Sequence, residues 1–190
     1  MKKIACLFPG IGYTCDKPLL YYCIKILKAE KWEVIPLKYT GFPDGVKGNR
    51  DKMEKCVSMA LEQTEEALKE INWSEYGEIL FIGKSVGTVV CTLFAQQQGL
   101  FCRQILFTPV NETFDFADCR CIAFHGTADP WAETETIRKR CSQLNIPLYE
   151  SDDANHSLET GDTDHDISQL RQIMKTIMEY ILSETEQTEP

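Results

Sequence analysis

Short apolar runs alternate along this chain with segments whose hydrophobic residues recur every three or four positions. The apolar runs predict six β-strands, at residues 4–8, 32–39, 78–82, 104–107, 121–124 and 147–150. The periodic segments predict five helices, at residues 17–29, 51–72, 86–98, 134–144 and 167–183. Strands that alternate with helices are typical of a mainly parallel sheet with helices on both faces. The sequence therefore predicts an α/β three-layer sandwich.

The ends of several elements carry local signals. Asp16 precedes the first helix and Pro18 lies in its first turn, while Asp166 precedes the last helix. An aspartate at a helix start accepts a hydrogen bond from a free backbone N–H, and proline there loses no hydrogen bond. We therefore expect Asp16 and Asp166 to be N-caps. Segment 40–50 contains three glycines and Pro43, which predicts a loop.

Two prolines predict the order of the strands. Pro36 and Pro147 belong to the second and sixth predicted strands, and the other four strands contain no proline. Proline has no N–H to donate in the middle of a sheet, so these two strands should form the edges. The order 2-1-3-4-5-6 satisfies this condition. Ligands of such sheets bind at the carboxyl ends of strands where the order reverses, here beside strands 1 and 3.

The turn after the third strand fits the pattern G-x-S-x-G. Residues 83–87 read Gly-Lys-Ser-Val-Gly, between the apolar strand 78–82 and the helix 86–98. In this context the pattern indicates a nucleophile elbow, a tight turn that lifts the serine above the sheet. Ser85 is therefore the candidate nucleophile. The side chain of Lys84 should point away from Ser85, and we assign it no catalytic role.

A phosphate-binding loop is the competing interpretation of the same residues. Gly83, Lys84 and Ser85 resemble the end of such a loop. The loop requires a glycine five residues before Gly83, where this chain has Glu78, and flexible residues between, where it has an apolar strand. The sequence therefore disfavours a nucleotide site on both grounds.

A serine nucleophile needs a base that is oriented by a third group. Of the three histidines, His156 lies in a polar loop after the last strand, His125 follows a strand and should brace its own loop, and His165 should be solvated. The acid is expected after a strand and between serine and histidine in sequence, which favours Asp129. Two other acids of that interval, Asp152 and Asp153, are too close along the chain to His156. Ser85, His156 and Asp129 thus form the predicted triad.

Four motifs together resemble those of the α/β-hydrolase superfamily, in particular its small dienelactone-hydrolase-like members. They occupy residues 8–12, 83–87, 125–129 and 155–159, in the order of the family and across nearly the whole chain. The resemblance implies a minimal core that lacks the first two strands of larger members. It also implies an oxyanion hole made by the backbone N–H groups of Ile11 and Val86, which would stabilise the charge of a carbonyl under attack. Pro9 stands where the family often has histidine, and an ordinary tight turn remains the alternative for this segment.

The net charge and the cysteine content indicate which binding partners and which cellular compartment to expect. A net charge of −9 excludes a protein that coats nucleic acid or an anionic membrane, since both require a basic surface. Nine cysteines cannot all pair within one chain, and Cys6, Cys91 and Cys121 lie in apolar runs as expected of buried free thiols. We therefore expect a cytoplasmic protein without a signal peptide. Its single domain should span residues 1–183, followed by a polar tail at 184–190.

The substrate is less well defined by the sequence than the chemistry. Only residues 109–120 separate the fourth strand from the fifth, which leaves no room for a cap over the site. Tyr13, the loop 40–50, Asn111 and Trp131 are the candidate walls of an open site. A small carboxylic ester or thioester is the expected substrate, with no cofactor and no metal. A catalytically silent binding module and an acyltransferase with the same triad remain alternatives, and the oligomeric state is left open.

Overall fold

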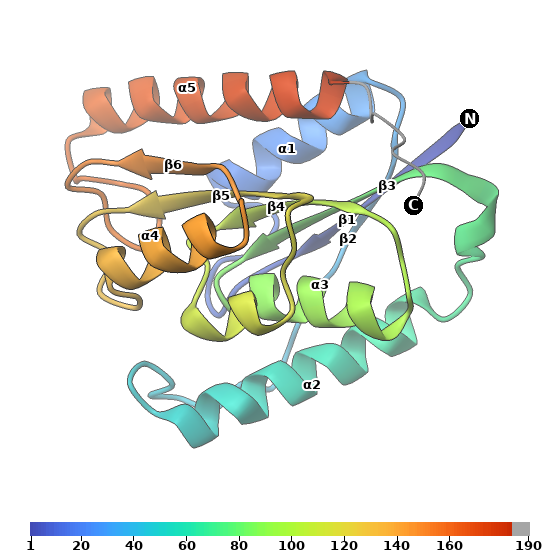
Figure 1. Ribbon diagram of the computed structural model, residues 1–190, viewed down its shortest axis with the longest axis horizontal. Helices are drawn as coiled ribbons and strands as arrows, with labels where there is room; N and C mark the ends of the chain where they lie inside the picture. The colour runs from blue at the N-terminus through green and yellow to red at the C-terminus, as the bar shows by residue number, and fades with distance from the viewer. Residues whose placement is uncertain (184–190) are drawn as a thin grey trace.

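The computed structural model describes residues 1–183 and contains one six-stranded sheet (Figure 1). Its strands are β1 (Lys2–Phe8), β2 (Glu33–Pro36), β3 (Tyr76–Lys84), β4 (Arg103–Phe107), β5 (Cys121–Gly126) and β6 (Leu148–Ser151). Their order is β2-β1-β3-β4-β5-β6, and each neighbouring pair is parallel. The predicted order is confirmed, and the sheet is fully rather than mainly parallel. The predicted tail, 184–190, lies outside the described residues.

The two proline-containing strands lie at the edges. Pro36 ends β2, and Pro147 directly precedes β6, where its carbonyl accepts a hydrogen bond from Ala123 N–H at 2.9 Å. At an edge, a proline does not interrupt the hydrogen bonding between inner strands. The four inner strands are buried on both faces, which explains their nearly continuous apolar sequences.

Helices cover both faces of the sheet. They are α1 (Pro18–Ala29), α2 (Arg50–Leu68), α3 (Val86–Gln97), α4 (Thr134–Gln143) and α5 (Thr163–Leu182), with short 3₁₀ helices η1 (Trp73–Glu75) and η2 (Asn111–Asp115). The core residues of α1 and α5 pack on one face, and those of α2, α3 and α4 pack on the other. Figure 1 shows these layers above and below the sheet. The three-layer architecture is therefore confirmed. Within residues 1–183, no helix has both the length and the apolar composition needed to cross a bilayer.

The predicted N-caps are wrong. The residue before α1 is Lys17, which makes no side-chain cap, and the proline in the first turn marks the start of the helix instead. Helix α5 begins at Thr163, and the carboxylate of Asp162 caps it by accepting from His165 N–H at 3.0 Å. Asp166 lies inside the first turn and accepts from the backbone N–H of Thr160 at 2.7 Å. Several acids near one helix start made the position of the cap ambiguous.

Around the turn at residues 83–87, the backbones of β1 and α3 pack together with no side chain between them. A Cβ at Gly87 would lie 2.0 Å from the carbonyl oxygen of Phe8, and a Cβ at Gly83 would lie 2.7 Å from the carbonyl oxygen of Gly87. Backbone atoms cannot move aside as the end of a flexible side chain can. The two glycines therefore set the distance between the helix and the sheet.

Gly87→Ala should destabilise the protein strongly, because the added methyl group must push α3 away from β1. We expect the free energy of unfolding to fall by at least about 3 kcal/mol, at the upper end of overpacking effects. Urea denaturation followed by circular dichroism measures this loss. Gln96→Ala, at an exposed position of the same helix, is the control. Equal midpoints for the two variants would contradict the close approach.

Candidate active site

Ser85 occupies a strained turn at the carboxyl end of β3. It has φ +56° and ψ −122°, a conformation that costs a non-glycine residue energy and that surrounding contacts must hold. Its backbone N–H donates to the carbonyl of Phe107 at 3.0 Å, and its own carbonyl accepts from the hydroxyl of Thr88 at 2.6 Å. These bonds fix the turn, and α3 begins at the next residue. The predicted strand–turn–helix context of the motif is therefore present.

The three predicted triad side chains form one hydrogen-bonded chain. His156 Nε2 lies 2.7 Å from Ser85 Oγ, and His156 Nδ1 lies 2.7 Å from Asp129 Oδ2. Asp129 follows β5, and its other oxygen, Oδ1, accepts from the backbone N–H of Trp131 at 2.8 Å. The carboxylate fixes the proton of the imidazole on Nδ1, so Nε2 presents a lone pair to the hydroxyl of Ser85. This arrangement can remove a proton from serine.

The imidazole of His156 is held by stacking as well as by hydrogen bonds. The ring of Trp131 lies on it with centroids 5.0 Å apart and an interplanar angle of 17°. Burial lowers the pKa of His156 below its ordinary value of 6.5, and the hydrogen bond to Asp129 acts in the opposite direction. Because lowering this pKa favours the neutral ring, the environment favours the form that acts as a base.

The first loop of the chain lies against the elbow. A Cβ at Gly10 would come within 3.1 Å of Ser85 Cβ, so the glycine allows the loop to approach the serine. A pair of backbone hydrogen bonds between Gly10 and Tyr13 closes the turn around Ile11. Among residues 1–183, the backbone N–H groups of Ile11 and Val86 have no hydrogen-bond acceptor. Both donors are thus unused within the part of the chain that the structure describes.

The other two histidines are not part of the hydrogen-bonded chain. His125 is buried, and its Nε2 lies 3.0 Å from the hydroxyl of Thr134. This contact connects the end of β5 with the start of α4, across the loop between them. The Nδ1 of His125 lies 4.0 Å from Asp129 Oδ2. His165 is exposed and lies 3.2 Å from the side chain of Gln169. These placements match the expectations for both residues.

The three residues expected to contact substrate differ in their surroundings. Tyr13 is largely buried, and its hydroxyl accepts from the backbone N–H of Leu19 at 3.1 Å. Trp131 is half-buried and stacks on His156, and Asn111 is exposed at the start of η2. The loop 40–50 contributes Val46 to a small cluster that includes Val86 and Trp131. Pairwise packing of this kind has no periodic signature in the sequence.

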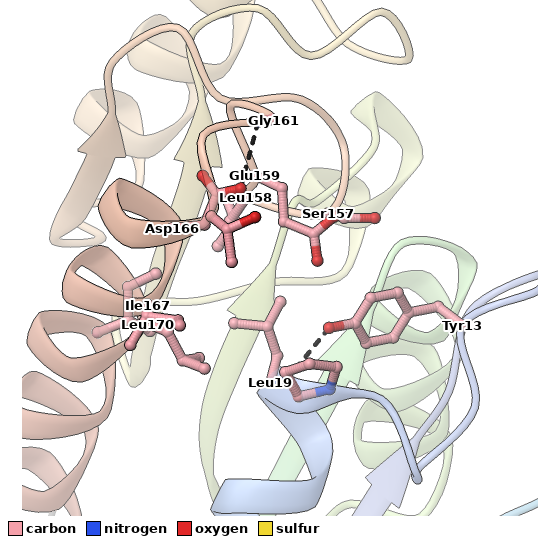
Figure 2. A pocket seen from close by; sticks show the side chains of 12 residues that line it. Tyr13, Leu19, Ser157, Leu158, Glu159, Gly161, Asp166, Ile167 and Leu170 are labelled. Carbon is pink, nitrogen blue, oxygen red and sulfur yellow. Dashed lines mark hydrogen bonds between the residues drawn. The ribbon is translucent and has the colours of Figure 1, made fainter.

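A pocket of about 420 Å³ lies beside the His156 loop (Figure 2). It is formed by the loop after β1, the loop after β6 and the start of α5. Apolar side chains dominate its wall, and two acids, Glu159 and Asp166, join them. Ser157, the residue next to His156, and Tyr13 lie on its edge. The lining residues come from two stretches, 13–19 and 157–173, that are distant in the chain, so no local pattern in the sequence indicates the pocket.

Lys84 makes a connection that the sequence did not predict. It is fully buried, and its ammonium donates to the hydroxyl of Thr108 at 2.6 Å. The same hydroxyl donates to the backbone carbonyl of His156 at 3.2 Å. Lys84 therefore points away from Ser85, as its strand position predicts, yet it is connected to the histidine through a residue at the end of β4.

Known proteins resemble this chain in structure rather than in sequence. No family model matches the sequence, and no curated protein matches it. Solved structures do match: Est1E from Butyrivibrio proteoclasticus has a TM-score of 0.66 at 12% identity, covering 96% of this chain and 89% of that one. An esterase from Pyrococcus furiosus has a TM-score of 0.66 at 14% identity, with coverage of 95% and 82%.

A third similar structure has a comparable degree of likeness. It is an α/β serine hydrolase without a lid from Xanthomonas campestris, with a TM-score of 0.61 at 14% identity and coverage of 96% and 83%. At these identities the likeness concerns the fold, and it extends over nearly the whole of this chain and over 82–89% of the three others. The chain therefore has the fold of the α/β-hydrolase superfamily, as its four motifs predicted.

Proposed function

We propose that this protein is a serine hydrolase that cleaves carboxylic esters or thioesters through an acyl-enzyme intermediate. The observation that carries the proposal is the continuous chain of 2.7 Å hydrogen bonds from Ser85 Oγ through His156 to Asp129. A buried serine in a strained turn, bonded to an imidazole that a carboxylate orients, is the arrangement of a nucleophile with its base. Several structures of similar fold are named esterases or serine hydrolases, which supports the same reaction class.

In the proposed reaction, Ser85 Oγ attacks the carbonyl carbon while its proton passes to His156 Nε2. The carbonyl oxygen becomes negative and accepts hydrogen bonds from the N–H groups of Ile11 and Val86. Collapse of this intermediate breaks the ester bond, and His156 returns the proton to the departing alcohol or thiol. Water then attacks the acyl-serine, His156 again takes and returns a proton, and the acid leaves. Asp129 stabilises the imidazolium that forms in each half of the reaction.

The proposed substrate is a small ester or thioester. The β4–β5 connection holds only the short helix η2, so no cap is inserted between these two strands. A small domain without a cap also supports the proposed likeness to dienelactone-hydrolase-like members. The pocket beside Ser157 offers mainly apolar walls and carboxylates but no basic side chain. We infer that it accommodates an uncharged part of the substrate more readily than an anionic one.

Labelling with a fluorophosphonate probe tests this proposal directly. The wild-type protein should react at Ser85, because only an activated serine is phosphonylated under mild conditions. Ser85→Ala should not react, and His156→Ala should react far more slowly. If folded wild-type protein is not labelled, the hydrolase proposal fails and a binding module without catalysis becomes the better description. Product analysis with added alcohols then separates hydrolysis from acyl transfer.

A further inference from the structure

Lys84 is a fully buried amine that donates a hydrogen bond to a neutral hydroxyl rather than to a carboxylate. It is the last residue of β3, and its side chain enters the apolar layer on the α1 and α5 side of the sheet. Among residues 1–183, the hydroxyl of Thr108 is its hydrogen-bond acceptor, and its ammonium lies 5.0 Å from the ring centroid of Tyr13. A cation removed from water at such cost requires a reason beyond packing.

Thr108 links this cation to the histidine loop. Its backbone has φ +41°, which is unusual for a β-branched residue, and its N–H donates to Phe124 at 2.7 Å. Its hydroxyl accepts from Lys84 and donates to the backbone carbonyl of His156. One hydroxyl thus uses its proton and a lone pair to connect the end of β3 with the loop after β6.

We propose that Lys84 is a positioning residue for His156: through Thr108 it fixes the histidine loop, and its ammonium, buried one hydroxyl away from that loop, disfavours a second positive charge on the imidazole. The inference rests on the proposed function, in which neutral His156 is the base. It assigns Lys84 no contact with substrate. It predicts instead that removal of this cation changes the proton affinity of a residue on a different loop.

The charges around both groups determine the sign of the effect. His156 faces the carboxylate of Asp129, which favours its protonation, and the cation of Lys84 and the ring of His125, which oppose it. Lys84 faces the carboxylates of Asp129 and Glu159, while burial lowers its pKa to about 7. Below about pH 7, where the His156 ring titrates, Lys84 carries its charge, so its loss should raise the pKa of His156, because one opposing cation disappears while Asp129 remains.

The variants Lys84→Met and Lys3→Met form a matched pair. Methionine keeps an apolar chain of similar length, and it removes a buried charge, so Lys84→Met should fold. Lys3 lies at the opposite end of the neighbouring strand β1 and pairs with Glu78 at 2.7 Å, so its replacement removes the same charge far from His156. Titration of the His156 ring by NMR, with His156→Ala for assignment, reads proton affinity without requiring turnover.

We expect the pKa of His156 to rise in Lys84→Met and to stay unchanged in Lys3→Met. With an activated ester, the acidic limb of kcat/KM should move to higher pH in Lys84→Met. The ratio of kcat/KM at about pH 5.5 to that at about pH 8.5 should then fall roughly threefold or more. An unchanged or lower pKa of His156 in Lys84→Met would overturn the inference.

Variants of Thr108 test separately whether the link through this residue positions the histidine loop. Thr108→Val should lower kcat about tenfold with a smaller change in KM, because a loosened loop misplaces the base. Thr108→Ser keeps the hydroxyl and should retain most of the wild-type rate. Equal rates for the two variants would contradict the positioning of the histidine loop through Thr108. If wild-type protein escapes the fluorophosphonate while the pKa of His156 still rises in Lys84→Met, the proposed function fails and the linkage stands. If the wild-type protein is labelled but the pKa of His156 does not change in Lys84→Met, the proposed function stands and the linkage fails.

Discussion

Ser85→Ala is expected to lower kcat for an activated aryl ester by about 10⁶-fold, to the background rate. The substitution removes the atom that forms the acyl-enzyme, and no other hydroxyl is bonded to His156 Nε2 among the described residues. Alanine keeps the Cβ that packs near Gly10, so the elbow should keep its geometry. Initial rates with a p-nitrophenyl ester measure the loss, and urea denaturation checks the fold.

The neighbouring serine provides the control for this experiment. Ser157 lies next to His156 on the edge of the pocket, and no hydrogen bond of its hydroxyl connects it to the triad within residues 1–183. Ser157→Ala should retain kcat within a few-fold of wild type. Substantial activity in Ser85→Ala would instead show that the chemistry occurs elsewhere.

Asp129→Asn is expected to lower kcat by about 10⁴-fold while leaving the fold intact, by analogy with the same change in other triads. The amide is similar in shape, and its oxygen can still accept from Trp131 N–H. Its nitrogen, however, would donate to His156 Nδ1 and favour the tautomer with a proton on Nε2. That tautomer cannot accept the proton of Ser85. Steady-state kinetics on the same ester measure the effect.

Other acids before His156 serve as the comparison. Asp152 and Asp153 are exposed and lie in the same sequence interval as Asp129. Asp152→Asn and Asp153→Asn should each change kcat by less than about threefold, in keeping with ordinary surface substitutions. A loss in either variant that matches the loss in Asp129→Asn would reassign the acid.

Much of the fold was predictable because each signal was local and strong. Proline reports on its own hydrogen bonding, so Pro36 and Pro147 identified the edges without any knowledge of the sheet. The glycines around Ser85 report a turn too tight for side chains, and the structure shows the short contacts they avoid. With three histidines in the chain, the order of serine, aspartate and histidine left few combinations. The structure brings the predicted three side chains together.

The features that the sequence did not reveal depend on contacts between distant segments. The stacking of Trp131 on His156 and the bond from Lys84 to Thr108 join loops that follow different strands. The position of the cap at Asp162 rather than Asp166 depends on how the preceding loop folds back. None of these follows from periodicity or composition, because each needs the three-dimensional path of a loop.

The strained backbones of Ser85 and Thr108 have a consequence for how this chain tolerates change. Both residues hold positive φ at adjacent strand ends, and each such residue costs on the order of 1–3 kcal/mol. Glycine would relieve that cost at either position. The hydroxyl of Thr108 would be lost with that change, and with it the bonds to Lys84 and to the His156 carbonyl. The two strand ends thus combine backbone strain with side chains that glycine cannot supply, as is typical of functional sites.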